Sequence, residues 1–306
     1  MRSRSRSRQP IAALVAVAGL AGAGSAAWAQ ENNEEPPVRF RLDGGATFDG
    51  TADLDDSPGD VSVARVRSAF EADFRVDARS RFALQFSSEF SFYDFDGATG
   101  LVPGTDSPLD DTYDYRVGGR YSRSLDDGWG MFVGGDVRFS GEHGADAGDS
   151  VTGGGFGGVT YDVSDRLTLG IGLAVRTRLE DNARLIPIPV VDFRITDEWR
   201  LSTDGPGLKL AYTPDPAFTV YVAGRWESRE FRLDEDGPLP GGVARDERVP
   251  IVLGATWRPN DTITVDGFVG AVVWNEYEFI NSAGTTIAET ETDAHLTAGV
   301  QLTLKF

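Results

Sequence analysis

The chain has 306 residues, of which 40% are hydrophobic and 25% charged, and its mean hydropathy is −0.25. This composition excludes a helical membrane protein, and the length suits one large β domain. There is no cysteine, which excludes disulfides and thiol catalysis. With 48 acidic against 29 basic residues the formal net charge is −19, so we expect no binding to nucleic acid.

The amino terminus has the layout of a secretory signal peptide. Residues 11–24 are apolar and small, and Ala27-Trp28-Ala29 matches an A-x-A cleavage site. The basic residues that precede the apolar stretch are Arg2, Arg4, Arg6 and Arg8. We therefore predict a cleaved signal peptide over residues 1–29, which directs export through the inner membrane. A disordered lead-in follows over residues 30–37, and one domain over residues 38–306.

From residue 38 onward, apolar residues recur at every second position in one segment after another. The first segment places Val38, Phe40 and Leu42 on one face and charged residues on the other. The cleanest later set is Leu167, Leu169, Ile171, Leu173 and Val175. A period of two is typical of a β-strand with one apolar and one polar face. The segments exceed the usual strand length, so the pattern predicts an all-β protein built from long strands.

The predicted connections between these strands alternate between short and long. The short ones are residues 77–81, 124–128, 163–166, 196–198, 213–217 and 258–261. The long ones are residues 50–60, 94–111, 141–150 and 234–247. Aromatic residues gather near both kinds of connection, as in Trp129 and Trp257 near short turns and Tyr115 and Trp226 near long loops. Sorted loops and two aromatic girdles are typical of a barrel with short periplasmic turns and long extracellular loops.

The last segment, residues 291–306, alternates over its whole length and ends on an aromatic residue. Its apolar face carries Val300, Leu302, Leu304 and Phe306. It resembles the closing strand of bacterial outer-membrane β-barrels, whose terminal Phe and alternating apolar positions form an assembly signal. The resemblance implies a single transmembrane antiparallel up-and-down barrel in a Gram-negative-type outer membrane. Outer-membrane lipids and the barrel assembly machinery are then the expected partners.

Residues 167–274 carry a narrower resemblance. Stretches such as LTLGIGLAVRTRLEDN and YVAGRWESREFRLDEDG look like an uncharacterised family of barrels, defined only as a domain of unknown function. This resemblance supports the fold and implies no activity, cofactor or site.

Residues 199–203 and 208–212 form two short apolar runs around Asp204-Gly205-Pro206-Gly207. Such a barrel has an even number of strands, so two short strands here give about 14 in total, with 12 as the alternative. Each run is shorter than the roughly nine to eleven residues that span a bilayer. We therefore predict a low hairpin that opens the lumen sideways. Pro187 and Pro189 would lie on the preceding strand where the hairpin cannot reach.

If the apolar faces contact lipid, the polar faces line the lumen. The predicted lumen-lining residues are Arg65, Arg67, Glu71, Asp73, Glu89, Asp114, Arg116, Arg120, Asp136, Arg138, Arg176, Asp192, Arg194, Arg225, Glu227, Asp266 and His295. They carry both signs of charge. One interpretation is a porin-like aqueous pore lined by charge. The other is a filled lumen in which arginines and carboxylates neutralise one another.

Three functions remain open at this point. The first is a passive channel for small solutes, and the second is a closed structural or surface barrel. The third and most remote is an outer-membrane hydrolase. The two histidines, His143 and His295, have no nucleophile motif around them, so we expect no catalytic residue and no enzyme. The acidic loops fit no calcium-binding signature, so we expect no metal site and no cofactor.

Overall fold

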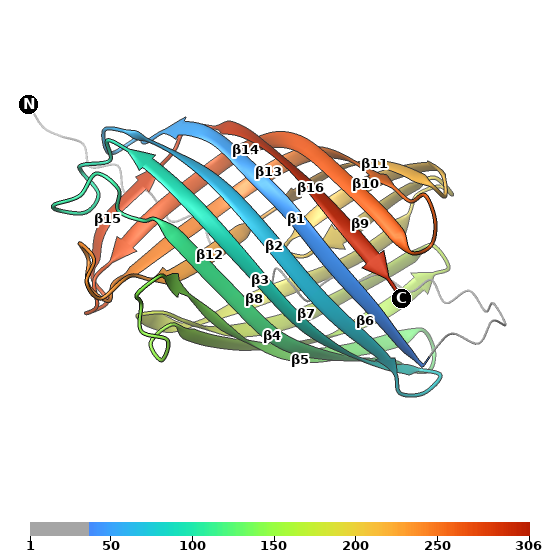
Figure 1. Ribbon diagram of the computed structural model, residues 1–306. Helices are drawn as coiled ribbons and strands as arrows, with labels where there is room; N and C mark the ends of the chain where they lie inside the picture. The colour runs from blue at the N-terminus through green and yellow to red at the C-terminus, as the bar shows by residue number, and fades with distance from the viewer. Residues whose placement is uncertain (1–36) are drawn as a thin grey trace, which may run out of the picture.

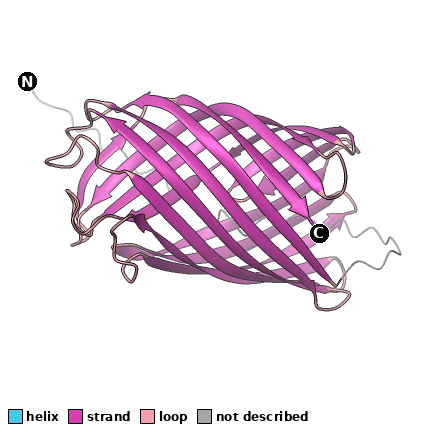
Figure 2. Cartoon of the chain, viewed as in Figure 1, coloured by secondary structure: helices cyan, strands magenta, loops and turns pink. Residues whose placement is uncertain are grey.

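The computed structural model describes residues 37–306, which form one β-barrel whose strands are joined by turns and loops (Figures 1 and 2). The predicted signal peptide and all but the last residue of the lead-in lie outside the described residues. The described part of the chain contains no helix long and apolar enough to cross a membrane.

The strands follow one another along the chain with no other regular element between them. They are β1 (Val38–Asp53), β2 (Asp60–Arg75), β3 (Ser80–Asp96), β4 (Asp111–Ser124), β5 (Trp129–Glu142), β6 (Val151–Ser164), β7 (Leu167–Arg178), β8 (Asp181–Arg194), β9 (Trp199–Asp204), β10 (Gly207–Asp215), β11 (Phe218–Arg225), β12 (Glu227–Arg232), β13 (Val243–Trp257), β14 (Ile263–Ile280), β15 (Thr286–Glu291) and β16 (His295–Lys305).

Sequential antiparallel pairing carries these strands around a closed ring. The ring closes where β1 pairs with β16. Both β11 and β12 pair with β13, and both β15 and β16 pair with β14, so each couple is one wall strand broken in the middle. Within residues 37–306 the wall therefore has 14 strands. This confirms the predicted antiparallel barrel of about fourteen strands.

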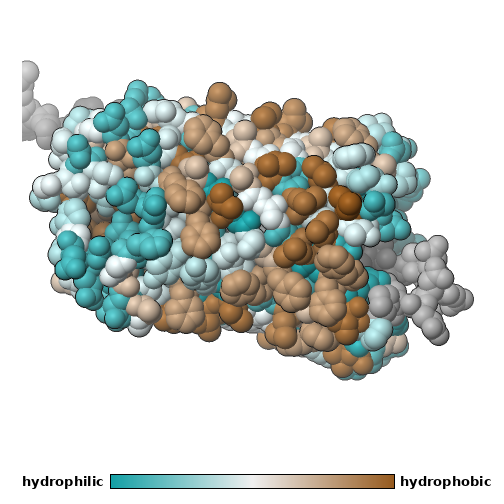
Figure 3. All heavy atoms as spheres, viewed as in Figure 1, coloured by the Kyte–Doolittle hydropathy of each residue, from teal (hydrophilic) through white to brown (hydrophobic). Residues whose placement is uncertain are grey.

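The outer face of the wall is apolar around its middle. Alternate residues such as Ile171, Leu253 and Val300 are 65%, 58% and 55% exposed. Figure 3 shows the hydrophobic residues as a broad band, with hydrophilic residues gathered at the end where the long loops lie. Exposed aromatic pairs such as Trp129–Tyr161 flank this band, with ring centroids 4.9 Å apart. Such a band suits contact with lipid acyl chains.

The two ends of the barrel differ. The carboxy terminus and the turns at residues 76–79, 125–128 and 258–262 lie at one end, the turn end. In one of these turns the backbone N–H of Arg79 donates to Asp77 at 2.7 Å, which holds the pKa of that carboxyl below its usual value. The long loops lie at the other end, the loop end: residues 54–59, 97–110, 143–150 and 233–242.

Three connections on the loop-end side are short, and the sequence pattern indicated only the one within the low hairpin. They are residues 179–180, 205–206 and 281–285. Glu180 and Gly205 adopt positive φ angles of 53° and 57°, as tight two-residue turns require.

Several predicted boundaries were wrong. The loop predicted at residues 50–60 begins later, because β1 continues to Asp53. The loop predicted at residues 234–247 is shorter, because β13 already begins at Val243. Its first residues, from Val243 to Asp246, are buried on both faces, so no apolar–polar alternation marks them in the sequence. The closing strand predicted from residue 291 is interrupted: β15 ends at Glu291 and β16 begins at His295.

The hairpin of β9 and β10 is low, as predicted. The two strands have six and nine residues, against 14 in β8. The ladder between β8 and β9 runs only from Asp192↔Ser202 to Arg194↔Arg200. The rest of β8 rises above the hairpin toward the loop end.

Candidate functional site

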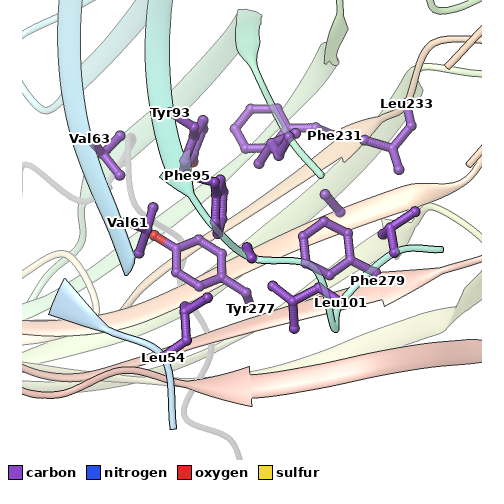
Figure 4. Packing of buried hydrophobic residues seen from close by; sticks show 14 residues of the cluster. Leu54, Val61, Val63, Tyr93, Phe95, Leu101, Phe231, Leu233, Tyr277 and Phe279 are labelled. Carbon is purple, nitrogen blue, oxygen red and sulfur yellow. The ribbon is translucent and has the colours of Figure 1, made fainter. Parts of the chain in front are cut away.

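The loop end of the barrel is closed by an apolar cluster that packs across its interior. The cluster contains side chains from strands β2, β3, β12, β13 and β14. Loop 97–110 adds Leu101, Val102 and Leu109 from the loop end. Figure 4 shows the side chains of this cluster converging. Tyr277 and Phe95 lie edge to face with ring centroids 5.3 Å apart. Because these side chains are buried, the mouth at this end is filled by protein.

On the turn-end side of this cluster, buried ion pairs cross the lumen. Arg65 of β2 contacts Asp246 of β13 at 2.7 Å and also contacts Asp49 of β1. Arg248 of β13 joins Asp49 to Glu227, with Nη2–Oε2 at 2.6 Å to the latter. Strands β2 and β13 are not neighbours in the wall, so these side chains meet inside the barrel.

The same network also joins β12 to β3. Arg229 of β12 contacts Glu89 of β3 at 2.6 Å and Glu227 at 3.0 Å, and Arg225 contacts Glu227 at 2.6 Å. Tyr93 donates its hydroxyl to Asp246 at 2.8 Å. The carboxylates and guanidinium groups are thus paired with one another at this level of the lumen, which is the arrangement of the filled alternative.

A second set of pairs lies on the inner wall formed by β4, β5 and β7. Asp136 accepts from Arg176 at 2.9 Å and lies 3.7 Å from Arg116. Arg138 contacts Asp114 on the neighbouring strand. Three arginines and two carboxylates share this patch, so its formal charge is positive.

The other predicted lumen residues lie nearer the turn end or at the hairpin, except His295, which begins β16 near the loop end. Their contacts are Arg67 with Gln301, Asp73 with Arg81 at 3.4 Å, Asp192 with Arg200 at 2.6 Å, Asp266 with Tyr221 at 2.7 Å, and His295 Nδ1 with the carbonyl oxygen of Asp293 at 3.1 Å. Glu71 and Arg120 are half-buried, and Arg194 is exposed. Among the described residues, no group of His, Asp or Glu side chains is arranged to hold a metal ion.

The sequence analysis missed several members of these networks. The missed residues are Asp49, Tyr93, Arg229, Glu230, Arg245, Asp246 and Arg248. Asp49 continues the polar alternation of the first strand and could have been included. Arg245 and Asp246 fell inside the predicted loop 234–247. Arg229 and Glu230 belong to β12, whose short length gave no clear period.

The unpaired edge of β8 is the conspicuous feature of the wall. The N–H of Val191 donates to Thr203 Oγ1 of β9 at 2.8 Å, so odd-numbered N–H groups of β8 point toward the hairpin. Pro187 and Pro189 occupy the next two odd positions, above the last ladder pair. Both lack an N–H. At these two positions any other residue would place an unpaired backbone N–H in the hydrocarbon layer of the membrane. Proline has no N–H, so the edge avoids that cost.

The strand across from this edge turns away from it. Beyond Trp226, β12 pairs with β13 and meets β5 on its other side, at Arg232↔Gly141. In residues 37–306, no backbone ladder joins β8 to β12. We call the region between them the lateral window. Its lower border is the turn from Asp204 to Gly207, and its upper border is the turn between β7 and β8.

An apolar cluster lies on the inner wall beside the lateral window. Phe156, Ala174, Ile186 and Ile188 are buried there, and Phe132, Val190 and Trp226 pack against them. Glycines make room for the aromatic rings: a Cβ on Gly158 would lie 2.5 Å from Phe132 Cζ. The outer face here is apolar too, with Leu173 and Leu185 exposed, so the wall beside the window is apolar on both sides.

Comparison with known proteins gives a likeness of fold. No family model and no curated protein matches the chain, so the narrower resemblance to an uncharacterised family stays a prediction. Among solved structures, an outer membrane channel from Pseudomonas putida F1 is 9% identical with a TM-score of 0.48, covering 88% of this chain and 95% of that one. The Pseudomonas putida toluene transporter TodX is 9% identical with a TM-score of 0.46, covering 89% and 91%.

A third solved structure, a Pseudomonas aeruginosa FadL homologue, is 12% identical with a TM-score of 0.46, covering 88% of this chain and 90% of that one. At these identities and scores, what their names say of substrates stays with those proteins.

Proposed function

We propose that this barrel is a passive channel of the bacterial outer membrane, through which small solutes pass sideways between the lumen and the outer leaflet by way of the lateral window. The carrying observation is the unpaired edge of β8, with Pro187 and Pro189 at the positions whose N–H would face the window. Unpaired strand edges are avoided in lipid because each unsatisfied group costs several kcal/mol. An edge left without a backbone partner and cleared of donors therefore suggests that the wall can open there.

The closed loop end supports a sideways route. The apolar cluster around Tyr277 and Phe279 fills the mouth, and the ion-pair network around Asp49 fills the level below it. A solute that enters at the turn end meets a charge-lined lumen and then this filled region. The lateral window lies beside the low hairpin of β9 and β10, below the filled mouth.

The border of the window favours apolar or weakly polar solutes. A molecule leaving through it passes the cluster around Ile186 and Ile188 and enters acyl chains. Moving a charged group into hydrocarbon is costly, whereas a small apolar molecule gains by the transfer. The charged residues nearer the turn end would keep that part of the lumen hydrated. They would not determine which solutes pass through the window.

The test is a flux measurement on protein refolded into vesicles whose outer leaflet contains lipopolysaccharide. We expect naphthalene to reach an internal cyclodextrin trap faster than in protein-free vesicles, and glucose to stay out. A variant with Ile188 replaced by Trp should reduce naphthalene flux, whereas Asp77→Asn in a turn should not. Equal entry of glucose, with a large ohmic conductance, would instead indicate an open axial pore.

The second candidate is a closed structural or surface barrel. The observation that favours it is the extent of pairing in the lumen, where Arg65, Arg229 and Arg248 all have carboxylate partners. In the same vesicles, the absence of both naphthalene flux and single-channel conductance would support it and reject the channel.

A further inference from the structure

One carboxylate holds the upper border of the lateral window. Glu230 of β12 accepts from Arg178 Nε at 2.7 Å and from the backbone N–H of Leu179 at 3.2 Å. Both donors belong to the end of β7 and the turn that leads into β8. The Glu230 side chain is 12% exposed, so these contacts are largely shielded from water.

The same carboxylate is anchored to the body of the barrel. Arg245 of β13 donates to Glu230 Oε1 at 2.8 Å. Its other nitrogens reach the carbonyl oxygen of Leu179 at 3.2 Å and Glu278 at 2.8 Å. Glu230 therefore joins the β7–β8 turn to β12 and β13 by side-chain contacts, where the backbone ladder is absent among the described residues.

Below this point, the β7–β8 hairpin lies over apolar side chains. Ile186 and Ile188 of β8 are 2% and 7% exposed and belong to the cluster that packs against Trp226. Trp226 stands at the break between β11 and β12 and stacks on Trp274, with ring centroids 4.7 Å apart. One edge of the hairpin is thus tied by β6 through a full ladder. The other edge is tied at its base by the short ladder to β9, and toward the loop end by Glu230, by Arg245 at the carbonyl oxygen of Leu179, by the Arg232–Glu180 ion pair at 2.8 Å, by the Arg184–Glu247 pair at 3.4 Å and by apolar contact.

We propose that the β7–β8 hairpin is the movable wall of the lateral window, latched shut by Glu230 and swinging away from Trp226 when the latch opens. This inference rests on the proposed function for its purpose and on the contacts of Glu230 for its mechanism. A wall strand paired along one edge can rotate about that ladder without breaking it. The two hairpin donors held by Glu230, together with the Arg232–Glu180 ion pair at 2.8 Å, make the closed position the favoured one.

The test uses the absence of cysteine from the chain. A single cysteine at position 186, as Ile186→Cys, reports whether the hairpin covers its inner face. The refolded protein in vesicles is treated with a charged, membrane-impermeant maleimide, and the labelling rate is measured. The labelling rate is compared in three proteins: one with Ile186→Cys alone, one that also carries Glu230→Gln, and one that also carries Glu278→Gln.

Glu278→Gln is the matched control, because Glu278 also accepts from Arg245 but does not contact the β7–β8 turn. We expect Glu230→Gln to raise the labelling rate about tenfold or more, since the amide places an N–H against groups that already donate. Glu278→Gln should change it less than about twofold. Equal rates in the three proteins, or equal acceleration by both variants, would overturn the latch.

A second variant guards against misfolding. Arg178→Gln removes the donor on the hairpin and leaves the Glu230–Arg245 contact, so it should also accelerate labelling. Heat-modifiable gel mobility verifies that each variant is a folded barrel. The labelling experiment needs no solute, so a failure of naphthalene transport leaves the latch test intact, and a constant labelling rate leaves the transport test intact.

Discussion

The centre of the filled lumen can be tested at Asp49. Its side chain is 2% exposed and contacts Arg65 and Arg248, whose side chains are 3% and 4% exposed. Thr297 also donates to it at 2.7 Å. Asp49→Asn removes the charge between two buried guanidinium groups without changing the side-chain volume. The substitution therefore isolates the electrostatic contribution.

The magnitude follows from what remains after the change. Breaking a buried ion pair by removing one partner costs about 3–5 kcal/mol. Arg65 keeps Asp246 and Arg248 keeps Glu227, at 2.7 and 2.6 Å, so neither is left isolated. We therefore expect Asp49→Asn to lower the free energy of unfolding by about 3 kcal/mol, the low end of that range.

The same strand offers a control. Asp43 lies on the inner face of β1, is 14% exposed, and pairs with Arg41, which is 46% exposed. Because that charged partner is solvated, and the Asn carbonyl oxygen can still accept from Gln301 and Thr303, Asp43→Asn should cost no more than about 1 kcal/mol. Urea unfolding in lipid vesicles, followed by tryptophan fluorescence, measures both.

Two results would contradict this reasoning. One is an equal loss of stability in the two variants. The other is an unchanged stability of Asp49→Asn together with altered ion selectivity in planar bilayers. The second result would mean that Asp49 lines open water, and that the aqueous-pore interpretation of the lumen is correct.

Three further predictions concern the wall and the carboxy terminus. Pro189→Ala adds an N–H that faces the lateral window, and should cost about 1–3 kcal/mol in urea unfolding, whereas Pro259→Ala in an exposed turn should be nearly neutral. Gly158→Ala forces a Cβ against Phe132 and against the backbone of β7, 2.6 Å from the carbonyl oxygen of Ile171, and should cost about 1–3 kcal/mol. A Cβ on Gly155 has its nearest neighbour at 3.6 Å, so Gly155→Ala should not destabilise; opposite results would refute the close packing at Gly158. Phe306→Ala removes a side chain that is 69% exposed and keeps the two backbone hydrogen bonds to Phe40, so it should reduce the amount of assembled barrel in cells while leaving the melting temperature of refolded protein nearly unchanged.

Much of the fold is written in the local pattern of the chain. A period of two sets which side chains face outward on every long strand, because neighbouring residues of a strand point to opposite faces. The low hairpin was also predictable, because Asp204-Gly205-Pro206-Gly207 interrupts two runs that are too short to span. The prolines of β8 were correctly read as marking an unpaired edge, because a proline cannot donate to a ladder.

The candidate site was predictable only in part. Alternation identifies a residue such as Glu89 or Glu227 as polar and inward, but not its depth or its partner across the lumen. Glu89, for example, pairs with Arg229, which lies 140 positions further along the chain.

The course of β12 and the filling of the loop end were decided by tertiary structure alone. The pairing of Arg232 with Gly141, the insertion of loop 97–110 and the joining of two walls by Glu230 are contacts between distant segments. Buried residues such as Ala244 and Asp246 face neighbours on both sides, so they leave no alternation in the sequence. Local periodicity records only whether a residue points toward lipid or inward, and everything beyond that depends on which strands the closed ring brings face to face.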